Sequence, residues 1–315
     1  MNIEESVANF LKENPDKFVP IIETFFIRHT IDLDIDQETR DRLWRERLVA
    51  VHYPKDYKNI LGDVDNESLN PEDYIGKART AIRYINELAK SGGYVWAEYF
   101  GRDCVLVGKV PPGSHVKLLR GRWGSLHGLD GREAVLKTVK LSQVIEVLPA
   151  TCAALMAARP RQGTIMHWPK AKRAIERLVE GITEQITLDD LSPDHQEVIC
   201  NEYLRQERLP HGIPSLSKLL LPIGRTMKDL DLLGLASDDK LICAQVTYSR
   251  IEEIGHKMER LKAYAGSDTY LLMFCSATEV ANKDGVHIIP LEWVFDWVNT
   301  SEWGERWLEL NFPNK

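Results

Sequence analysis

The stretch KDLDLLGLASDDKLICAQVTYSR, residues 228–250, contains two apolar runs separated by ASDDK, a polar segment typical of a turn. Side chains of a β-strand alternate between two faces, so the stretch predicts a hairpin with Asp229 and Asp231 on one face of its first strand. Gln245 and Thr247 share one face of the second strand. Polar side chains therefore gather where a core could have taken valines.

Two interpretations of this cluster are open. A carboxylate buried alone is costly, so it must be neutralised, paired or bound to a metal ion. Hard cations such as Mg²⁺ take carboxylate, amide and backbone carbonyl oxygens, which the acidic pair and Gln245 offer together. In the structural alternative, Asp229 and Asp231 cap the start of a strand or lie on a solvated face, and Gln245 is a satisfied polar residue.

The surrounding sequence, residues 191–315, predicts alternating helices and strands. A helix with Ser192 as N-cap and Pro193 at its first position precedes the hairpin. An amphipathic helix over 251–264 and the nearly all-apolar strand TYLLMFCSA follow it. Because an apolar strand reached through a helix implies a covered sheet, this region predicts a mixed α/β fold with helices on both faces.

The motif spacing in this region resembles the PD-(D/E)XK nuclease superfamily, in particular the Mrr-like restriction endonucleases. The resemblance rests on a helical glutamate, a strand ending in D-x-D and a following strand with Q-V-x. It implies a restriction-endonuclease-like α-β-β-β-α-β core. Carried over by position, it makes Glu197 the helical acid with Glu202 in reserve, Asp231 the strand aspartate, and Gln245 the (E/Q) residue. Asp229 stands where some relatives have an additional acid.

The same resemblance implies a divalent cation, Mg²⁺ or Mn²⁺, at the scissile phosphate of DNA. Its implied ligands are Asp231, Gln245 and the backbone carbonyl of Val246, with Glu197 and Asp229 supporting the metal or its waters.

Thr247 departs from the family pattern, because it stands where the family has a lysine. A neutral hydroxyl cannot offset charge in a phosphoryl transition state. Lys257, on the helix that follows this strand, is the candidate that supplies the missing cation, since such a helix packs against this edge of the sheet. The alternatives are that Thr247 is simply a β-former and Lys257 a solvated helix residue.

The rest of the chain predicts three further regions in an α/β, multi-domain protein. Residues 1–92 are expected to be mostly helical, with helices over 4–14, 16–29, 36–52 and 77–90. Residues 93–150 read as short β-branched strands between turns, a small antiparallel sheet or barrel. Residues 151–190 form a helical, basic junction before the nuclease-like region.

Charge is unevenly distributed along the chain, whose formal net charge is −7. Residues 101–175 carry 13 Lys and Arg against four Asp and Glu, so this region could hold a phosphate backbone or be a solvated surface. Trp123 and Trp168 lie among these basic residues, where they suit base stacking or a small core. The glycine turns match neither GxxxxGK[ST] nor GxGxxG, so no motif predicts a nucleotide loop.

The cysteines and the N-terminal segment indicate in which cellular compartment the protein is expected. Five widely spaced cysteines without a CxxC pair favour a reducing cytoplasm. The acidic MNIEESVANF start does not match a secretory signal, and no apolar run approaches the roughly 18 residues of a membrane span. A cytoplasmic protein is expected.

Taken together, these features lead to a metal-dependent DNA endonuclease of a bacterial restriction or anti-phage type, with DNA as its partner and a homodimer or a defence-system partner protein as possible assemblies. The main alternative is a catalytically inactive nuclease-fold subunit that binds DNA or assembles with proteins, because Thr247 replaces the lysine. A third hypothesis is an unrelated α/β enzyme whose likeness to the nucleases is accidental.

Overall fold

The computed structural model describes residues 23–30, 33–53, 67–126, 128–220 and 229–312. The chain divides into two compact units, residues 1–183 with 310–315, and residues 184–309. The sequence predicts boundaries at 92, 150 and 190, and only the last lies near the observed division. The other two do not separate compact units, because strands from both sides of residue 92 share sheets. No described helix is long and apolar enough to cross a bilayer.

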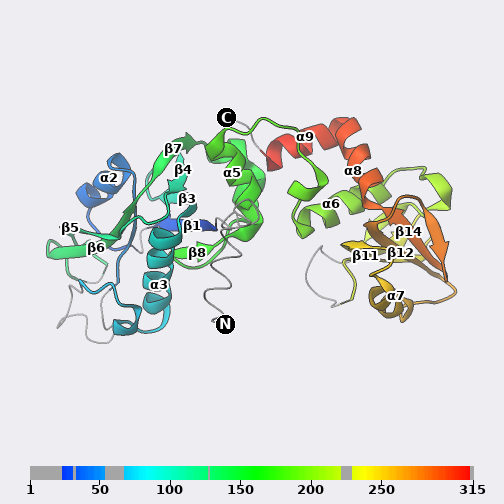
Figure 1. Ribbon diagram of the computed structural model, residues 1–315, viewed down its shortest axis with the longest axis horizontal. Helices are drawn as coiled ribbons and strands as arrows, with labels where there is room; N and C mark the ends of the chain where they lie inside the picture. Colours follow the sequence, from blue (N-terminus) through cyan, green and yellow to red (C-terminus); the bar gives the residue numbers. More distant parts are fainter. Residues whose placement is uncertain (1–22, 31–32, 54–66, 127, 221–228, 313–315) are drawn as a thin grey trace, which may run out of the picture. The chain divides into compact units, whose positions relative to one another are not determined.

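The first unit contains two sheets with helices packed against them (Figure 1). Its strands and α-helices in chain order are β1 (Thr24–His29), α2 (Gln37–Arg45), β2 (Leu48–Val51), α3 (Gly76–Ser91), β3 (Gly93–Tyr99), β4 (Val105–Val110), β5 (Lys117–Arg122), β6 (Glu133–Lys140), β7 (Ser142–Val147), α4 (Ala153–Ala158), β8 (Ile165–His167) and α5 (Lys172–Glu180).

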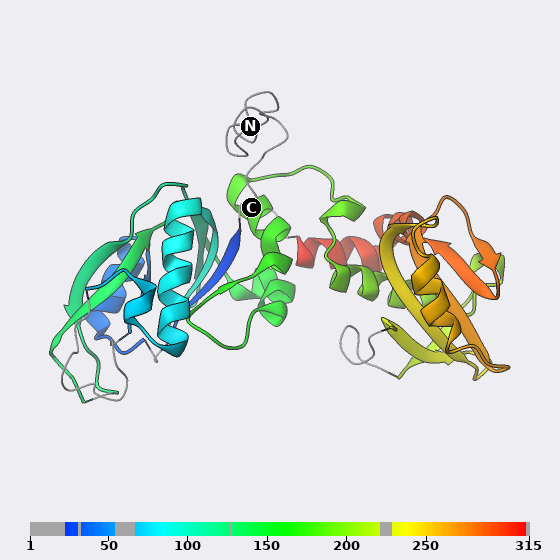
Figure 2. The ribbon, with the colours of Figure 1, turned by 60° about the horizontal axis from the view of Figure 1, so that its bottom comes forward.

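The larger sheet of this unit has the order β7-β4-β3-β1-β8, in which β1 and β3 run parallel. The smaller sheet has the order β2-β6-β5 and is antiparallel. Helix α3 packs against β2, β6 and β8, whereas α5 packs against β3, β4 and β7 (Figure 2). The apolar face of α3, including Ile82 and Ile85, enters the core that these elements enclose.

Two predicted helices of the N-terminal region are wrong in part: residues 37–45 form α2 as predicted, but other parts of the two segments are strands. Within 16–29, residues 24–29 form β1, and within 36–52, residues 48–51 form β2. Both segments are apolar at successive positions and buried on both sides, as in an interior strand, and such short runs do not distinguish helix from strand by period. The predicted helix over 77–90 corresponds to α3, and the one over 4–14 lies outside the described residues.

The β-rich stretch 93–150 is not a separate sheet or barrel. Strands β3, β4 and β7 join the larger sheet with β1, and strands β5 and β6 pair with β2. The sheets therefore combine strands from before and after residue 92. Turn-separated strands can be recognised in a sequence, but their partners across long connections cannot.

The second unit is a six-stranded mixed sheet covered by helices. Its elements are α6 (Pro193–Leu204), β9 (Leu216–Leu219), β10 (Leu232–Ala236), β11 (Leu241–Arg250), α7 (Gly255–Lys262), β12 (Thr269–Ser276), β13 (Ala281–Lys283), β14 (Val286–Pro290) and α8 (Leu291–Thr300), after which α9 (Glu302–Asn311) follows in the chain.

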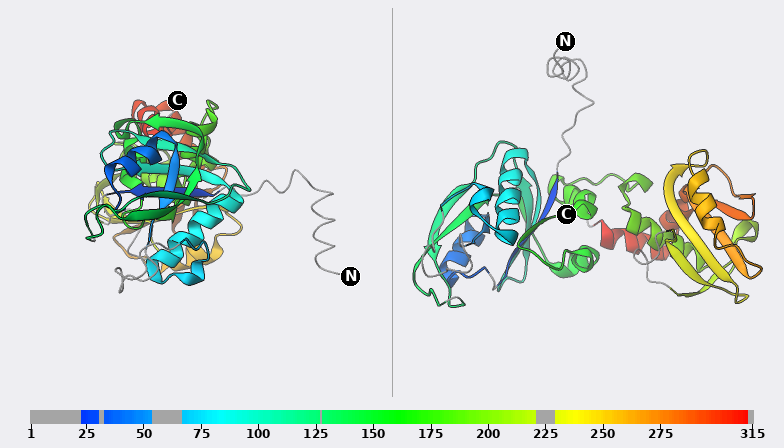
Figure 3. Two further views of the ribbon diagram at one scale, coloured as in Figure 1. Left: turned by 90° about the vertical axis from the view of Figure 1, so that its left-hand side faces the viewer. Right: turned by 90° about the horizontal axis from the view of Figure 1, so that it is seen from below.

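The strand order of this sheet is β13-β14-β12-β11-β10-β9. Strands β10 and β11 form the antiparallel hairpin that the opening stretch predicts, with Leu232 opposite Ala244. Strand β12 runs parallel to β11 after the α7 crossover. Helix α7 covers one face, whereas α6 and α8 contact the sheet from the other (Figures 1 and 3). The α/β class is confirmed, and so is the sheet covered on both faces.

Candidate functional site

The hairpin places Asp231 at the entry to β10. The strand begins at Leu232, so Asp229 and Asp231 precede it instead of alternating within it, which corrects the predicted shared strand face. The backbone N–H of Asp231 donates to the Ala244 carbonyl at 3.0 Å. Its carboxylate oxygen Oδ2 accepts the N–H of Val246 at 2.8 Å. The Asp231 carboxylate is therefore tied to the facing strand by the backbone.

The electrostatic setting of Asp231 disfavours its charge. Burial raises the pKa of this carboxyl above its ordinary value, whereas the Val246 N–H and the positive charge of Lys257 lower it. Because desolvation has the larger effect, the charged form is less stable than in water. A cation bound beside Asp231 would offset that penalty.

Gln245 lies in β11 with its side chain almost fully buried, at 7% exposure. Its Nε2 donates to the Asp229 carbonyl at 2.5 Å, which fixes the amide orientation. Its Oε1 accepts no hydrogen bond from any residue that the structure describes. A buried acceptor without a protein partner is unfavourable, and a bound water or a ligand would satisfy it.

Thr247 lies two residues further along β11, where the ammonium group of Lys257 on α7 contacts it. The Nζ of Lys257 donates to Thr247 Oγ1 at 2.6 Å. The threonine hydroxyl in turn donates to Ser249 Oγ at 3.2 Å and accepts the Ser249 N–H at 3.2 Å. The pairing of β11 with β12 changes register between Val246 and Arg250, and such an irregularity redirects side chains.

Asp229 forms an ion pair that the sequence does not predict. Its Oδ1 forms an ion pair with Arg260 Nη1 at 3.1 Å, and both side chains are partly exposed. Exposed pairs of this kind typically contribute at most about 1 kcal/mol. The missed residue is Arg260, which lies three positions after Lys257 on α7. Helical spacing would have placed both on one face.

The acid predicted on the first helix of this unit is Glu197 on α6, which is buried at 9% exposure. Burial, followed by the negative charges of Asp231 and Glu197, raises the pKa of the Cys200 thiol well above its ordinary value. Both acids therefore act on one buried atom. Glu202 instead accepts a hydrogen bond from Asn201 at 2.9 Å and pairs with Arg205 at 3.3 Å. Of the two, Glu197 is the one placed with Asp231.

The donor set fits a hard cation better than a soft one. Among the described residues, no group of three or more His, Cys, Asp or Glu side chains is arranged to hold a metal ion. A metal bound here would therefore need oxygen ligands of other kinds. Asp231, the Gln245 Oε1 acceptor and a backbone carbonyl provide such oxygens, as Mg²⁺ and Mn²⁺ prefer.

The tryptophans of the basic region belong to the core of the first unit. Trp123 is 1% and Trp168 is 3% exposed, so neither offers a face to a base. Trp123 packs against His52, and Trp168 packs edge-on against Phe26. Base stacking by these two residues, one of the two possibilities raised by the sequence, is excluded in this conformation.

Comparisons with known proteins give weak likenesses. No known family and no curated protein matches the sequence. Similar solved structures include the MspJI restriction endonuclease in complex with a 27-mer oligonucleotide, at 8% identity and a TM-score of 0.27, covering 84% of this chain and 74% of that one. A repair endonuclease from Pyrococcus abyssi has 10% identity and a TM-score of 0.18, covering 65% and 69%. An EndoMS–dsDNA2 complex has 11% identity and a TM-score of 0.20, covering 85% and 95%.

Proposed function

We propose that this protein is a metal-dependent DNA endonuclease that hydrolyses phosphodiester bonds, of the bacterial restriction or anti-phage type. The observation that carries the proposal is the 2.6 Å contact between Lys257 Nζ and Thr247 Oγ1. It supplies a cation from α7 at the strand position where the PD-(D/E)XK pattern has its lysine. The apparent loss of the lysine is thereby compensated from the next element of the chain.

The proposed metal ligands are Asp231, Gln245 through Oε1, and the carbonyl of Val246. Mg²⁺ or Mn²⁺ held there supplies Lewis acidity at the scissile phosphate. Two features of the chain support this assignment, namely the raised pKa of Asp231 and the buried Gln245 acceptor that has no partner among the described residues.

The other side chains of the site have supporting roles in the proposal. The Lys257 ammonium donates to a phosphate oxygen and balances charge that develops there, while Thr247 positions that ammonium. Glu197 orders water near Asp231. Arg260 neutralises Asp229, so that two aspartates can lie near a DNA phosphate. The chain order α6-β9-β10-β11-α7-β12 supports the proposal, because the resemblance implies an α-β-β-β-α-β core.

The test is cleavage of supercoiled plasmid in Mg²⁺ or Mn²⁺ by the full-length protein and by Asp231→Asn. The matched control is Asp239→Asn, which removes the same charge from the turn of the same hairpin. Asp239 has a positive φ of 64°, which asparagine adopts readily, so this variant should fold normally. We expect at least a 1,000-fold loss for Asp231→Asn, on the scale of losing a main catalytic group, and none for Asp239→Asn. Equal cutting by both variants, or no cutting in either metal, contradicts the proposal.

A catalytically inactive nuclease-fold subunit is the second candidate, favoured by the neutral Thr247. It predicts DNA or protein binding without hydrolysis. Binding to DNA that weakens steeply with salt, together with an uncut plasmid in both metals, would establish it in place of the endonuclease.

A further inference from the structure

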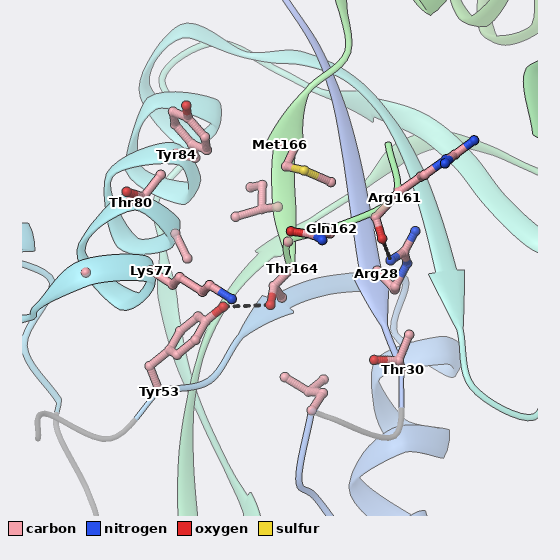
Figure 4. Close-up of a pocket in the computed structure, with 15 residues that line it drawn as sticks. Arg28, Thr30, Tyr53, Lys77, Thr80, Tyr84, Arg161, Gln162, Thr164 and Met166 are labelled. Atoms are coloured by element: carbon pink, nitrogen blue, oxygen red, sulfur yellow. Dashed lines mark hydrogen bonds between the residues drawn. The ribbon is translucent and has the colours of Figure 1, made fainter. Parts of the chain in front are cut away.

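A pocket in the first unit, distant in sequence from the hairpin of the second, has a volume of about 920 Å³. Ligand pockets usually span roughly 300 to 1,000 Å³, so this one can take a whole small molecule. Its lining comes from the end of β1 with Leu33, from Tyr53 after β2, from the first turns of α3, and from the loop 161–164 with the start of β8 (Figure 4).

The loop that forms one wall is held at both ends. Arg28 donates through Nη1 to the Arg161 carbonyl at 3.0 Å and through Nη2 to the Pro160 carbonyl at 2.7 Å. At the other end, the Tyr53 hydroxyl and Thr164 Oγ1 are hydrogen-bonded at 2.6 Å. Gln162 lies between these two clamps, so the backbone that carries its exposed side chain is held on both sides.

Helix α3 forms the opposite wall and presents different chemistry along its length. Lys77 lies in the first turn at the exposed rim, and Tyr84 lies two turns further along the same face (Figure 4). Seven residues of helix separate them by about 10 Å, comparable with the length of a nucleoside monophosphate. The guanidinium carbon of Arg83 lies 5.2 Å from the centroid of the Tyr84 ring, and the His167 ring packs edge-on against Tyr84 with the two centroids 4.6 Å apart.

The lining as a whole suits an anion joined to a planar ring. None of the described lining residues is acidic, and Lys77 forms no ion pair within the described part of the chain. Buried Ile165 and Ala81 give the floor an apolar character between the polar groups. A simple inorganic anion would leave the aromatic and apolar surface unused, whereas a purely apolar ligand would desolvate the Lys77 ammonium without pairing it.

We propose that this pocket binds a nucleotide, with the Lys77 ammonium on the phosphate, the Tyr84 ring against the base and the Gln162 amide on the base edge. A charge-assisted hydrogen bond, ring stacking and edge recognition are the usual components of such binding. The nucleotide is either free in solution or an unpaired nucleotide within a DNA strand. The proposal stands independently of hydrolysis in the second unit.

The first experiment is calorimetric titration of the full-length protein, in EDTA, with the four deoxynucleoside 5′-monophosphates, the matching nucleosides and inorganic phosphate. We expect at least one monophosphate to bind with one-to-one stoichiometry and at least tenfold more tightly than its nucleoside or phosphate alone. Lys77→Ala should weaken this binding about tenfold, whereas Lys90→Ala, at the exposed far end of the same helix, should leave it unchanged.

A second arm separates the two sources. Binding is compared between a short DNA duplex with one unpaired nucleotide and the fully paired duplex, with free monophosphate as competitor. A nucleotide within DNA predicts a preference for the unpaired duplex that Lys77→Ala and Gln162→Ala abolish and that monophosphate competes away. A free nucleotide predicts no such preference but intact monophosphate binding.

Either pattern supports the pocket. The proposal is overturned if no monophosphate binds and the unpaired duplex is not preferred. It is also overturned if phosphate alone binds as tightly as the nucleotides, or if Lys77→Ala and Lys90→Ala have the same affinity. Asp231→Asn should bind in the same way as the unmodified protein, so failure of the nuclease proposal and failure of the nucleotide pocket give different results.

Discussion

Two buried polar side chains, His29 in the first unit and Gln245 in the second, differ in how far their hydrogen bonds are satisfied. In the first unit, the fully buried His29 has both ring nitrogens occupied, with Nε2 accepting the Ala50 N–H at 2.9 Å and Nδ1 donating to the Glu98 carbonyl at 3.1 Å. In the second unit, Gln245 is nearly as buried, yet its Oε1 has no partner among the described residues. Both nitrogens of His29 are therefore satisfied by the protein itself, whereas the Gln245 oxygen could still accept a hydrogen bond or bind a cation.

The difference between these two residues suggests a structural role for His29 and a ligand-binding role for Gln245. A satisfied buried polar group stabilises one conformation and gains nothing from a ligand. An unsatisfied acceptor next to Asp231, whose carboxylate is itself disfavoured by burial, gains from a bound cation. His29 and Gln245 should therefore respond in opposite ways to substitution and to added metal.

The largest expected effect is on the stability of the first unit. His29→Leu leaves the Ala50 N–H and the Glu98 carbonyl without their partners and removes a ring stacked on Tyr99 at 4.3 Å. Each buried group left unsatisfied costs roughly 1 to 3 kcal/mol, so we expect a loss of about 4 kcal/mol. Hydrogen exchange of the strand amides of residues 48–51 measures it. An unchanged exchange rate, with exposed His115→Leu as control, would contradict the architectural role of His29.

Acid should reproduce that effect in the unmodified protein. Burial, with a contribution from the charge of Arg40, lowers the pKa of His29 from 6.5 to about 4. The unfolded chain therefore binds this proton more readily, and the stabilising contribution is complete above pH 6.5 and is lost as pH falls through about 4. A shift of this size corresponds to about 3 kcal/mol. Hydrogen exchange of the same strand, titrated from pH 7 to pH 4, follows it; His29→Leu should lack this dependence.

The fold could be predicted from the sequence where period and turn chemistry agree. The hairpin over 228–250 was recognisable because both runs alternate and ASDDK separates them. The strand TFFIRH was not, because a run that is apolar throughout its core positions fits a buried strand and a helix alike. Alternation also cannot show where a strand begins, which is why Asp229 and Asp231 were placed within β10 instead of before it.

The site could be predicted only in part, for a related reason. Strand spacing identified Asp231 and Gln245, but their partners come from turns and helices whose paths depend on packing. Arg260 reaches Asp229 across 31 residues of sequence, and the pKa of the Cys200 thiol is raised by burial and by the charges of Asp231 and Glu197, which lie in different parts of the chain. Lys257 can be predicted from the sequence because a helix that follows this strand packs against this edge of the sheet, and its Nζ contacts Thr247 Oγ1.

An intermediate effect on the plasmid cleavage rate is expected at Lys257, the proposed source of positive charge at the site. Lys257→Met should lower the plasmid cleavage rate about 100-fold, equivalent to about 2.7 kcal/mol, while Lys262→Met on the same helix leaves it unchanged. Lys262 pairs with Glu259 and Asp284, away from the hairpin. The double variant Thr247→Lys with Lys257→Thr should recover most of the activity, because it returns the cation to the strand. If Lys257→Met cuts as fast as the unmodified protein and the double variant does not, Lys257 has no role in cleavage.

The smallest effect expected is at Gln245, and it is the most direct measure of the difference between Gln245 and His29. Gln245→Met removes one hydrogen bond to the Asp229 carbonyl and, at the same time, the Oε1 acceptor that has no described partner, so the two terms oppose each other. We expect the free energy of unfolding of the second unit in EDTA to change by at most about 1 kcal/mol. The control Gln196→Met removes another buried glutamine of this unit, whose Nε2 donates to the Leu191 carbonyl at 3.2 Å.

Added Mg²⁺ then separates the two variants. At ten times its dissociation constant, a ligand stabilises the folded state by about 1.4 kcal/mol, and we expect the unmodified protein and Gln196→Met to gain this amount. Gln245→Met should gain much less, because the amide oxygen that would complete the cation site is gone. Thermal unfolding in EDTA and in Mg²⁺ measures the difference. An equal gain in all three proteins would show that the buried Gln245 oxygen has a structural role like the ring nitrogens of His29, and the contrast between these two residues would fail.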